Sequence, residues 1–367
     1  MAILCIIAPF AISIIVVYAF VIGKFIKGWK KNPDFATKES QPVTRVSIIT
    51  ACKNEIGQLP GFFRAVNEQT YRNFEFIVVD DGSKDGSYEY AGEVSFGFAE
   101  MRVVRNLGFG KKSAIRTGVY LSNNELVITL DADSLPSQDW LKTIVQFYEE
   151  NPSDLIICPV KLDTRNGFFN HFQQFEFASL VASGAGASGL GMPILCNGAN
   201  LAFRRDAWLM SESDLQFDEP SGDDIFLLQS IKSRNGKIQF LKSTEATTVT
   251  KPAEGVKSFF NQRKRWASKL TAFKDKQLAF AAITVFLACF AILLSLFFAL
   301  IDLRFLYLFL LIFITKWIVD SLFFRTIKSF FDLKNVSANS LLFSVFYLFY
   351  ILFTVVSAIL GRNKNRW

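Results

Sequence analysis

Four long apolar stretches set the limits on what this chain can fold into. They cover residues 1–23, 279–301, 304–324 and 339–360, and each is almost free of charged side chains. A helix needs roughly 20 apolar residues to cross a hydrocarbon core, so each stretch is long enough for one span. The residues between the first and second stretches have the mixed composition of a globular domain. We therefore expect a globular domain flanked by membrane helices.

Four lysines, Lys24, Lys27, Lys30 and Lys31, follow the first apolar stretch directly. This stretch lacks the basic start and the small-residue cleavage site of a signal peptide, so we expect a retained membrane helix. Basic residues favour the cytoplasmic side of a bilayer, which predicts a multi-pass protein of the inner or plasma membrane with its globular domain in the cytoplasm. The number and orientation of the later spans stay open, because both sides carry basic residues.

The net charge of +7 comes from 40 basic and 33 acidic side chains. The basic residues cluster beside the apolar stretches, so we expect them to face the lipid bilayer and expect no nucleic acid as a partner. The chain has five scattered cysteines and one histidine, a pattern that lacks the paired ligands of a zinc site.

Short β-rich runs alternate with helical segments through the first part of the globular region. The strands are apolar on both faces, which predicts an α/β domain with a parallel, Rossmann-like sheet covered by helices on both sides. We expect strands at 45–50, 74–80, 101–106, 125–130 and 155–160, and helices at 59–70, 87–94, 111–122 and 137–151.

The pattern is looser after residue 165. Residues 167–190 begin as an aromatic helix and end in a run of small residues, which indicates a substrate-facing loop or a surface on the membrane. Residues 256–273 are basic and aromatic with helical periodicity, as in an interfacial helix. The predicted organisation is a transmembrane helix at 1–23, a basic linker at 24–44, a globular domain at 45–253, an interfacial helix at 254–275, about three spans at 279–360 and a basic tail at 361–367.

Asp131 and Asp133 follow a predicted strand in the sequence LDADS. Side chains two residues apart in an extended segment point the same way, so both carboxylates can address one ion. Such oxygen ligands suit Mg²⁺ or Mn²⁺, which also accept phosphate oxygens. The alternative is an Asp-rich turn that only ends the strand.

Two further motifs lie where a nucleotide would bind such a sheet. Asp80 and Asp81 end another strand in VVDDGS, where a carboxylate can accept hydrogen bonds from a base or ribose. Lys111 and Lys112 lie at a probable helix start, a position that favours phosphate. The alternative for Asp80 and Asp81 is an ordinary turn. The alternative for Lys111 and Lys112 is a pair of solvated lysines on a helix.

Asp223 and Asp224 open a predicted helix in GDDIF. Either one can be an N-cap, but adjacent carboxylates also raise one pKa, as a general base near neutrality requires. We favour Asp224 as the base and Asp223 as its neighbour. The sequence QRKRW, which starts at Gln262, supplies cations and an aromatic plate for a diphosphate, or else anchors the chain at a membrane surface.

Taken in this order, the motifs resemble those of the membrane-bound family 2 inverting glycosyltransferases, whose nucleotide-sugar domain has the GT-A fold. The family includes cellulose, chitin and hyaluronan synthases and ceramide glucosyltransferases. The resemblance covers residues 46–266 and the flanking spans. It implies Asp224 as the catalytic base, and Asp131 and Asp133 as metal ligands. It also implies that a larger set of residues contacts the nucleotide-sugar donor: Thr50, Lys53, Glu55, Asp80, Asp81, Lys111, Asp131, Asp133, Asp223, Gln262, Arg265 and Trp266.

The implied reaction is a metal-dependent hexosyl transfer from a nucleotide-sugar donor, expected to be a UDP-sugar. Asp224 deprotonates an acceptor hydroxyl, and one displacement inverts the anomeric carbon. The acceptor is a polysaccharide or a lipid, and protein partners are not indicated. Two other classes stay open: an inactive membrane scaffold, and a transporter-like protein suggested by Lys316 and Asp320 within a span.

Overall fold

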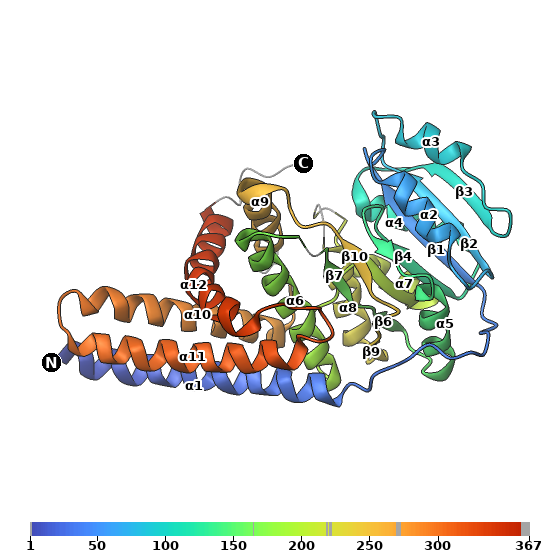
Figure 1. The fold of residues 1–367 in the computed structure, drawn as a ribbon. Helices are drawn as coiled ribbons and strands as arrows, with labels where there is room; N and C mark the ends of the chain where they lie inside the picture. The colour runs from blue at the N-terminus through green and yellow to red at the C-terminus, as the bar shows by residue number, and fades with distance from the viewer. Residues whose placement is uncertain (1, 164, 218, 220–221, 269–272, 361–367) are drawn as a thin grey trace. The chain divides into compact units, whose positions relative to one another are not determined.

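The computed structural model describes residues 2–163, 165–217, 219, 222–268 and 273–360. The chain divides into two compact units (Figure 1). Among the described residues, the sheet unit comprises those in 31–163 and 193–251, and the helical unit comprises those in 2–30, 165–192 and 252–360. The basic tail predicted at 361–367 lies outside the described residues.

A seven-stranded mixed sheet forms the centre of the sheet unit, in the order β3-β2-β1-β4-β8-β6-β9. Its strands are β1 (Val46–Cys52), β2 (Phe74–Asp80), β3 (Glu100–Arg105), β4 (Leu126–Leu130), β6 (Leu155–Ile157), β8 (Asn200–Arg204) and β9 (Ile238–Phe240). A small second sheet joins β5 (Leu135–Pro136), β10 (Thr248–Thr250) and β7 (Val160–Leu162). The helices of this unit are α2 (Leu59–Asn67), α3 (Ser87–Glu93), α4 (Gly110–Leu121), α5 (Trp140–Glu150), α7 (Arg205–Ser211) and α8 (Asp223–Ser233), with a 3₁₀ turn at Glu212–Asp214.

Strands β1 to β4 run parallel, as predicted, but the sheet as a whole is mixed because it also contains β8, a strand outside the five predicted ones. Strand β8 runs antiparallel to both β4 and β6. Asn200, the first residue of β8, pairs with Leu130, the last residue of β4, so β8 enters the sheet at the carboxyl edge of the parallel strands. An apolar pattern records burial on two faces but not strand direction, which is why the sequence did not reveal this reversal.

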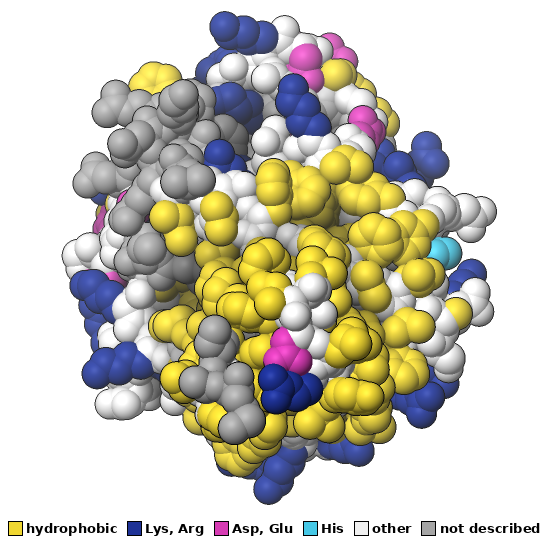
Figure 2. All heavy atoms as spheres, turned by 90° about the vertical axis from the view of Figure 1, so that its left-hand side faces the viewer, with side chains coloured by type: hydrophobic (Ala, Val, Ile, Leu, Met, Phe, Trp, Pro, Cys, Tyr) yellow, Lys and Arg dark blue, Asp and Glu magenta, His cyan; other side chains and the backbone are white. Residues whose placement is uncertain are grey.

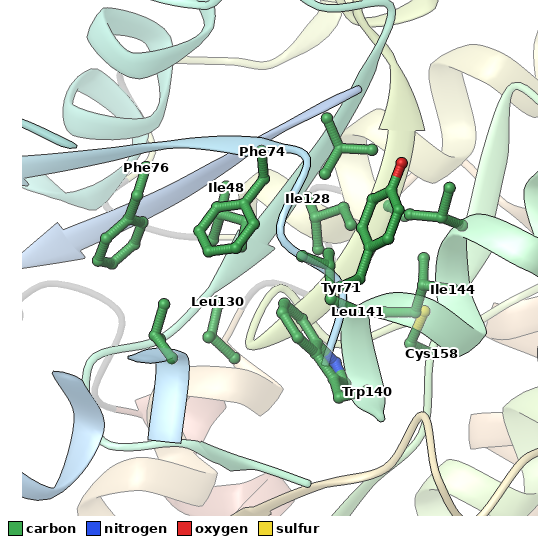
Figure 3. Packing of buried hydrophobic residues seen from close by; sticks show 14 of the residues in the cluster. Ile48, Tyr71, Phe74, Phe76, Ile128, Leu130, Trp140, Leu141, Ile144 and Cys158 are labelled. Atoms are coloured by element: carbon green, nitrogen blue, oxygen red, sulfur yellow. The ribbon is translucent and has the colours of Figure 1, made fainter. Parts of the chain in front are cut away.

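Side chains on the two faces of the sheet pack against different helices. Ile48 belongs to a buried cluster with residues of α2 and α5, while Ile49 on the opposite face lies against Gly118 of α4. Figure 3 shows Phe74, Phe76 and Trp140 packed in this cluster. Burying one such large apolar side chain stabilises the fold by about 1.5–3 kcal/mol. This packed core supports the ends of the strands, which carry the polar motifs.

The helical unit contains α1 (Ala2–Lys31), α6 (Phe168–Gly189), α9 (Gly255–Ala267), α10 (Lys276–Ala299), α11 (Arg304–Ile327) and α12 (Val336–Leu360). Among the described residues, α1, α10, α11 and α12 are long and apolar enough to cross a membrane. Figure 2 shows the side at which α1, α10 and α11 end in Figure 1, with hydrophobic side chains gathered on it. Helix α1 includes all four lysines that the sequence placed in a linker after the first span.

The segment 167–190 does not end in a loop, as the sequence suggested, because α6 runs unbroken through its small residues. These residues allow a close approach to α1. A Cβ atom added at Gly186 would overlap the Phe25 backbone, and one added at Gly28 would overlap the Gly186 carbonyl. Small residues serve this purpose between membrane helices, where close backbone packing replaces hydrophobic driving force.

One polar cluster links three of the apolar helices. Asp320 on α11 lies 2.6 Å from the Lys316 ammonium and accepts hydrogen bonds from the hydroxyls of Tyr18 on α1 and Ser344 on α12. Each charge therefore has a partner inside the helical unit. This geometry favours the interpretation of Lys316 and Asp320 as an internal pair that fixes the helices.

Candidate active site

Charged side chains from three elements of the sheet unit gather at the carboxyl edge of the sheet. Lys111 on the first turn of α4 lies 2.6 Å from a carboxylate oxygen of Asp131, which follows β4. Partial burial lowers the pKa of Lys111, but the charges of Asp131, Asp223 and Asp224 raise it by more. Lys111 is therefore a firmly protonated cation among carboxylates that belong to distant parts of the sequence.

The negative charge of Asp131 favours protonation of two neighbouring carboxylates, Asp133 and Glu55. Desolvation and the charge of Asp131 raise the pKa of Asp133, which also interacts with the Thr250 hydroxyl. Glu55, in the loop after β1, has its pKa raised to about 7 by burial and by the charges of Asp133 and Asp131. The loop itself turns at Asn54, which has a positive φ of 55°. A cation bound near Glu55, Asp131 and Asp133 would reduce the repulsion among these carboxylates.

A divalent metal fits this donor set. Mg²⁺ and Mn²⁺ prefer oxygen ligands, and Asp131 and Asp133, with Glu55 beside them, offer only such atoms. Within the described parts of the chain, no group of three or more His, Cys, Asp or Glu side chains is arranged to hold a metal ion. A site with one or two protein ligands leaves coordination positions for phosphate oxygens, as is usual for Mg²⁺.

Asp224 is held firmly at the start of α8. One of its carboxylate oxygens accepts a hydrogen bond from the Gly198 N–H at 3.0 Å, and the other accepts one from the Ile225 N–H at 2.8 Å. Burial and the neighbouring charge of Asp223 raise the pKa of Asp224, although Lys111 and the two hydrogen bonds oppose this. A fixed carboxylate with a raised pKa has the properties of a general base.

Gly198 lies directly beside the two aspartates that begin α8. A Cβ atom at this position would lie 3.4 Å from the Asp223 carboxylate and 3.4 Å from the Asp224 Cβ. The Gly198 carbonyl also accepts a hydrogen bond from Thr129 of β4, which ties the segment to the sheet. Sequence reasoning missed Gly198; its signal was the sequence NGAN before a strand.

The adjacent residues Asp80 and Asp81 have different surroundings. Asp80 accepts hydrogen bonds from the N–H groups of Gly82 and Ser83 and from Arg105, so it closes the turn after β2. Asp81 lies 2.9 Å from the Lys53 ammonium. Asp80 therefore stabilises the backbone turn after β2, while the nucleoside contact of Asp80 and Asp81 stays a prediction.

Asn106 organises the loop before α4. Its amide donates to Asp81 at 2.7 Å, and the Gly110 N–H donates to the same carboxylate oxygen at 2.8 Å. Burial raises the pKa of Asp81, but the hydrogen bonds from Lys53, Asn106 and Gly110 lower it by more. Sequence reasoning missed Asn106, although its place directly after a strand was a usable signal.

Thr50 lies inside the sheet. Its hydroxyl donates to the Leu130 carbonyl at 2.8 Å, and the side chain is fully buried. Thr50 thus ties β1 to the end of β4, directly before Asp131. Its predicted contact with the nucleotide is not needed to explain its position.

The motif QRKRW lies on α9 in the helical unit. Arg263 within it is buried and forms an ion pair with Glu176 of α6, with its Nε 3.0 Å from one carboxylate oxygen. The Tyr350 hydroxyl of α12 donates to the same carboxylate at 2.8 Å. Arg263 also donates to Gln262 and lies over the Trp266 ring, 4.3 Å from its centroid. The motif is therefore held by a buried ion pair that the sequence did not reveal, since Glu176 is far away in the chain.

Part of the chain is similar to known glycosyltransferases. Residues 47–209 match the model of glycosyl transferase family 2. Poly-beta-1,6-N-acetyl-D-glucosamine synthase from Staphylococcus epidermidis is 26% identical over 179 residues, which is 47% of this chain and 42% of that protein. Undecaprenyl-phosphate 4-deoxy-4-formamido-L-arabinose transferase from Pseudomonas paraeruginosa is 39% identical over 97 residues, 25% of this chain and 29% of that protein. The matches thus span less than half of these relatives.

A solved structure extends the likeness to the fold. A mannosyltransferase from Pyrobaculum calidifontis, determined in complex with GDP-Man and Mn²⁺, aligns with 99% of this chain and 100% of its own, with a TM-score of 0.59 and 18% sequence identity. The sequence-based prediction of family and fold is confirmed. Residues 47–209 thus match glycosyl transferase family 2, the fold is of the GT-A type, and the described residues include four helices long and apolar enough to cross a membrane.

Proposed function

We propose that the protein is a metal-dependent, inverting glycosyltransferase. It transfers a hexosyl group from a nucleotide-sugar donor, of the UDP type, to a hydroxyl of a polysaccharide or lipid acceptor. The observation that carries the proposal is the meeting of Lys111, Asp131 and Asp224 at one edge of the sheet. A cation for phosphate, a carboxylate for a metal and a base for a hydroxyl are the groups this reaction needs.

Asp224 takes the proton from the acceptor hydroxyl. Its hydrogen bonds from Gly198 and Ile225 fix the carboxylate, and the raised pKa lets it hold a proton after the transfer. General-base assistance of this kind contributes about 10²- to 10⁴-fold in rate. Because the hydroxyl itself attacks the anomeric carbon, one displacement inverts the configuration without a nucleophilic side chain.

Lys111 binds the diphosphate of the donor, and Asp81 with Lys53 orients the nucleoside. Asp131 and Asp133 would hold Mg²⁺ or Mn²⁺, which neutralises the charge of the leaving diphosphate when bound. Gln262, Arg265 and Trp266 are proposed to complete the diphosphate and acceptor site. Glu55 is proposed to lie beside the metal, because Asp131 and Asp133 raise its pKa.

The relatives support both classes of acceptor. One is named for a polysaccharide and the other for a lipid phosphate. The apolar helices support a membrane location, for which we propose the inner or plasma membrane with the sheet unit in the cytoplasm.

The decisive experiment incubates the purified chain in nanodiscs with a panel of UDP-, GDP- and other nucleotide sugars plus Mn²⁺ and measures nucleotide release. One donor class should release nucleotide well above the others. The variants Asp131→Asn and Asp224→Asn should lose this release, while Glu93→Gln, an exposed control, should retain it. Full release by Asp131→Asn would refute the enzymatic assignment.

A further inference from the structure

The helical unit contains a cavity of about 790 Å³ bounded by the start of α6, by α9 and by α12. Aromatic rings form most of its wall. Phe168 packs on Phe346 and Phe260 packs on Phe353, each pair with ring centroids 4.9 Å apart. Ligand sites commonly have volumes of about 300–1,000 Å³ and apolar walls. The cavity therefore has the size and the chemistry to hold a hydrocarbon chain.

Thr354 gives this apolar wall one polar atom. Its side chain is 6% exposed, and its hydroxyl has no hydrogen-bond partner among the described residues. By contrast, Thr315 and Thr326 on α11 each donate to a carbonyl of their own helix at 2.8 Å. A buried hydroxyl without a partner is unfavourable unless something else supplies one. A ligand with an oxygen atom would do so.

Two lysines add positive charge at the cavity. Lys257, Asn261 and Lys264 all line it and follow one another on α9 at spacings of four and three residues, so they share one face of the helix. No carboxylate of the described residues forms an ion pair with either lysine. The cavity thus joins a hydrocarbon-compatible wall to two cations, which complements a molecule with a long tail and an anionic group.

The same helix carries Gln262 and Trp266 of the QRKRW motif on another face, while Lys264, which also belongs to that motif, lines the cavity. At 100° per residue, Gln262 and Trp266 lie roughly opposite Lys257 and Lys264 around α9. Arg263 lies between these faces and is held by Glu176. Tyr350 connects the two sides, because it lines the cavity and donates a hydrogen bond to Glu176. One helix therefore presents both the motif and the cavity.

We propose that this cavity binds the tail of the acceptor, and that the acceptor is a saccharide joined to a long-chain lipid by a phosphate or diphosphate. This inference rests on the proposed function, in which Asp224 deprotonates a hydroxyl. The proposed base, Asp224, acts on a hydroxyl. Lys257 and Lys264 complement an anionic group, and the aromatic wall of the cavity suits a hydrocarbon chain. A saccharide linked to a lipid through phosphate has all three parts, whereas a free polysaccharide has only the first.

A direct binding experiment tests the site without turnover. The full chain in phosphatidylcholine nanodiscs is exposed to geranylgeranyl diphosphate with a diazirine at the end of its tail. Labelling should saturate, should fall on α9 or α12, and should be displaced by unlabelled geranylgeranyl diphosphate. The double variant Lys257→Gln/Lys264→Gln should weaken binding about 5-fold per lysine, since one cation near an anionic headgroup contributes about 1 kcal/mol.

The matched control is Lys328→Gln/Lys334→Gln, which removes equal charge from residues that do not line the cavity. It should bind the probe like the unaltered chain. Equal labelling by a diazirine-tailed phosphatidylcholine, unaffected by the lysine variants, would show that ordinary bilayer lipid fills the cavity and would overturn the proposal.

A kinetic experiment tests the link to the reaction. Ser357→Phe fills the cavity from α12. It should raise the KM for a long-chain diphosphate-linked saccharide by about 10-fold or more, and should leave the kinetics unchanged for the same saccharide diphosphate on a five-carbon tail. Equal loss with both acceptors would refute the tail site. If the probe labels the protein saturably but the protein transfers sugar to no acceptor, the lipid site would be supported and the proposed function would be refuted.

Discussion

At the scale of single residues, the surroundings of each carboxylate decide what it can do. Asp80 and Asp81 are neighbours in sequence, yet one closes a turn and the other joins Lys53 and Asn106. Asp224 differs from both because burial and Asp223 raise its pKa, while hydrogen bonds hold its two oxygens. The chemistry of an aspartate therefore follows from its donors and its charged neighbours.

Replacement of Asp224 by Asn should lower kcat by about 10²- to 10⁴-fold, because the amide cannot take a proton. Donor binding should change little, so the loss should appear in kcat and not in the donor KM. The unaltered protein needs ionised Asp224, and its pKa is raised. Its rate should therefore begin to fall with decreasing pH above the usual range of an aspartate, while the residual rate of Asp224→Asn should lack this step. A large rise in donor KM would contradict the role of Asp224 as base.

Glu55 should make metal binding depend on pH. Its pKa is about 7, so it gains its negative charge as the pH rises through neutrality. The affinity for Mn²⁺, measured by paramagnetic resonance, should increase between about pH 6 and about pH 8. The variant Glu55→Gln should lose this increase, and the exposed control Glu93→Gln should keep it. Identical pH profiles for all three proteins would exclude Glu55 from the metal site.

The same raised pKa has a consequence for folding without metal. The folded pKa of Glu55 lies above the ordinary value of 4.5, so the neutral carboxyl is favoured in the native state. This contribution to stability is complete below 4.5 and is lost as the pH rises through about 7. Glu55→Gln should accordingly flatten the pH dependence of the unfolding temperature in the presence of a chelator.

Removal of one partner of the Glu176–Arg263 pair should destabilise the helical unit. Glu176→Gln leaves a buried guanidinium without its counter-charge, which costs about 3–5 kcal/mol in comparable pairs. Thermal unfolding in detergent measures the loss. Glu150→Gln, which breaks an exposed pair with Lys38, should change stability by about 0–1 kcal/mol. Equal losses of stability in the two variants would mean that the buried Glu176–Arg263 pair matters no more for stability than the exposed Lys38–Glu150 pair.

At the scale of helices and strands, local patterns identify most elements but not their tertiary use. Short apolar, β-rich runs located β1 to β4 and helical periodicity located α2 to α5, since each pattern is decided by neighbouring residues. The direction of β8 and the unbroken course of α6 depend on pairing with Leu130 and on packing against Phe25. For the same reason, the aspartate motifs were recognised in the sequence, whereas the roles of Gly198, Asn106 and Glu176 depend on contacts with residues far away in the chain.

The close contact of α1 and α6 gives a prediction for helix packing. Gly186→Val adds a side chain where a single Cβ would already overlap Phe25, so the helices must separate. Overpacking of this kind costs about 1–3 kcal/mol. Thermal unfolding and the fluorescence of Trp29, which packs on Phe330, should both change. Gly23→Val is the matched control on α1, because nothing lies within 4 Å of a Cβ there. Equal unfolding temperatures would contradict the close packing.

At the scale of the whole molecule, the proposed orientation can be tested by labelling. In a cysteine-free background, Glu39→Cys in the sheet unit should react with an impermeant thiol reagent in inside-out vesicles but not in intact cells. Asp302→Cys, between α10 and α11, should show the opposite pattern if α10 crosses the bilayer. Labelling of Glu39→Cys in intact cells would place the sheet unit outside and refute the cytoplasmic assignment.

The polar cluster of Tyr18, Lys316 and Asp320 also constrains how the protein is made. Tyr18 and Asp320 are separated by 302 positions, so α1 leaves the ribosome long before its partner exists. At about 5–20 residues per second, the delay is roughly 15 to 60 s. During this time the sheet unit is synthesised and can fold, while the Tyr18 hydroxyl of α1 does not yet have Asp320 as its hydrogen-bond acceptor. The hydrogen bond between Tyr18 and Asp320 can therefore form only after α11 has been made, which makes it a late contact in the folding of the helical unit.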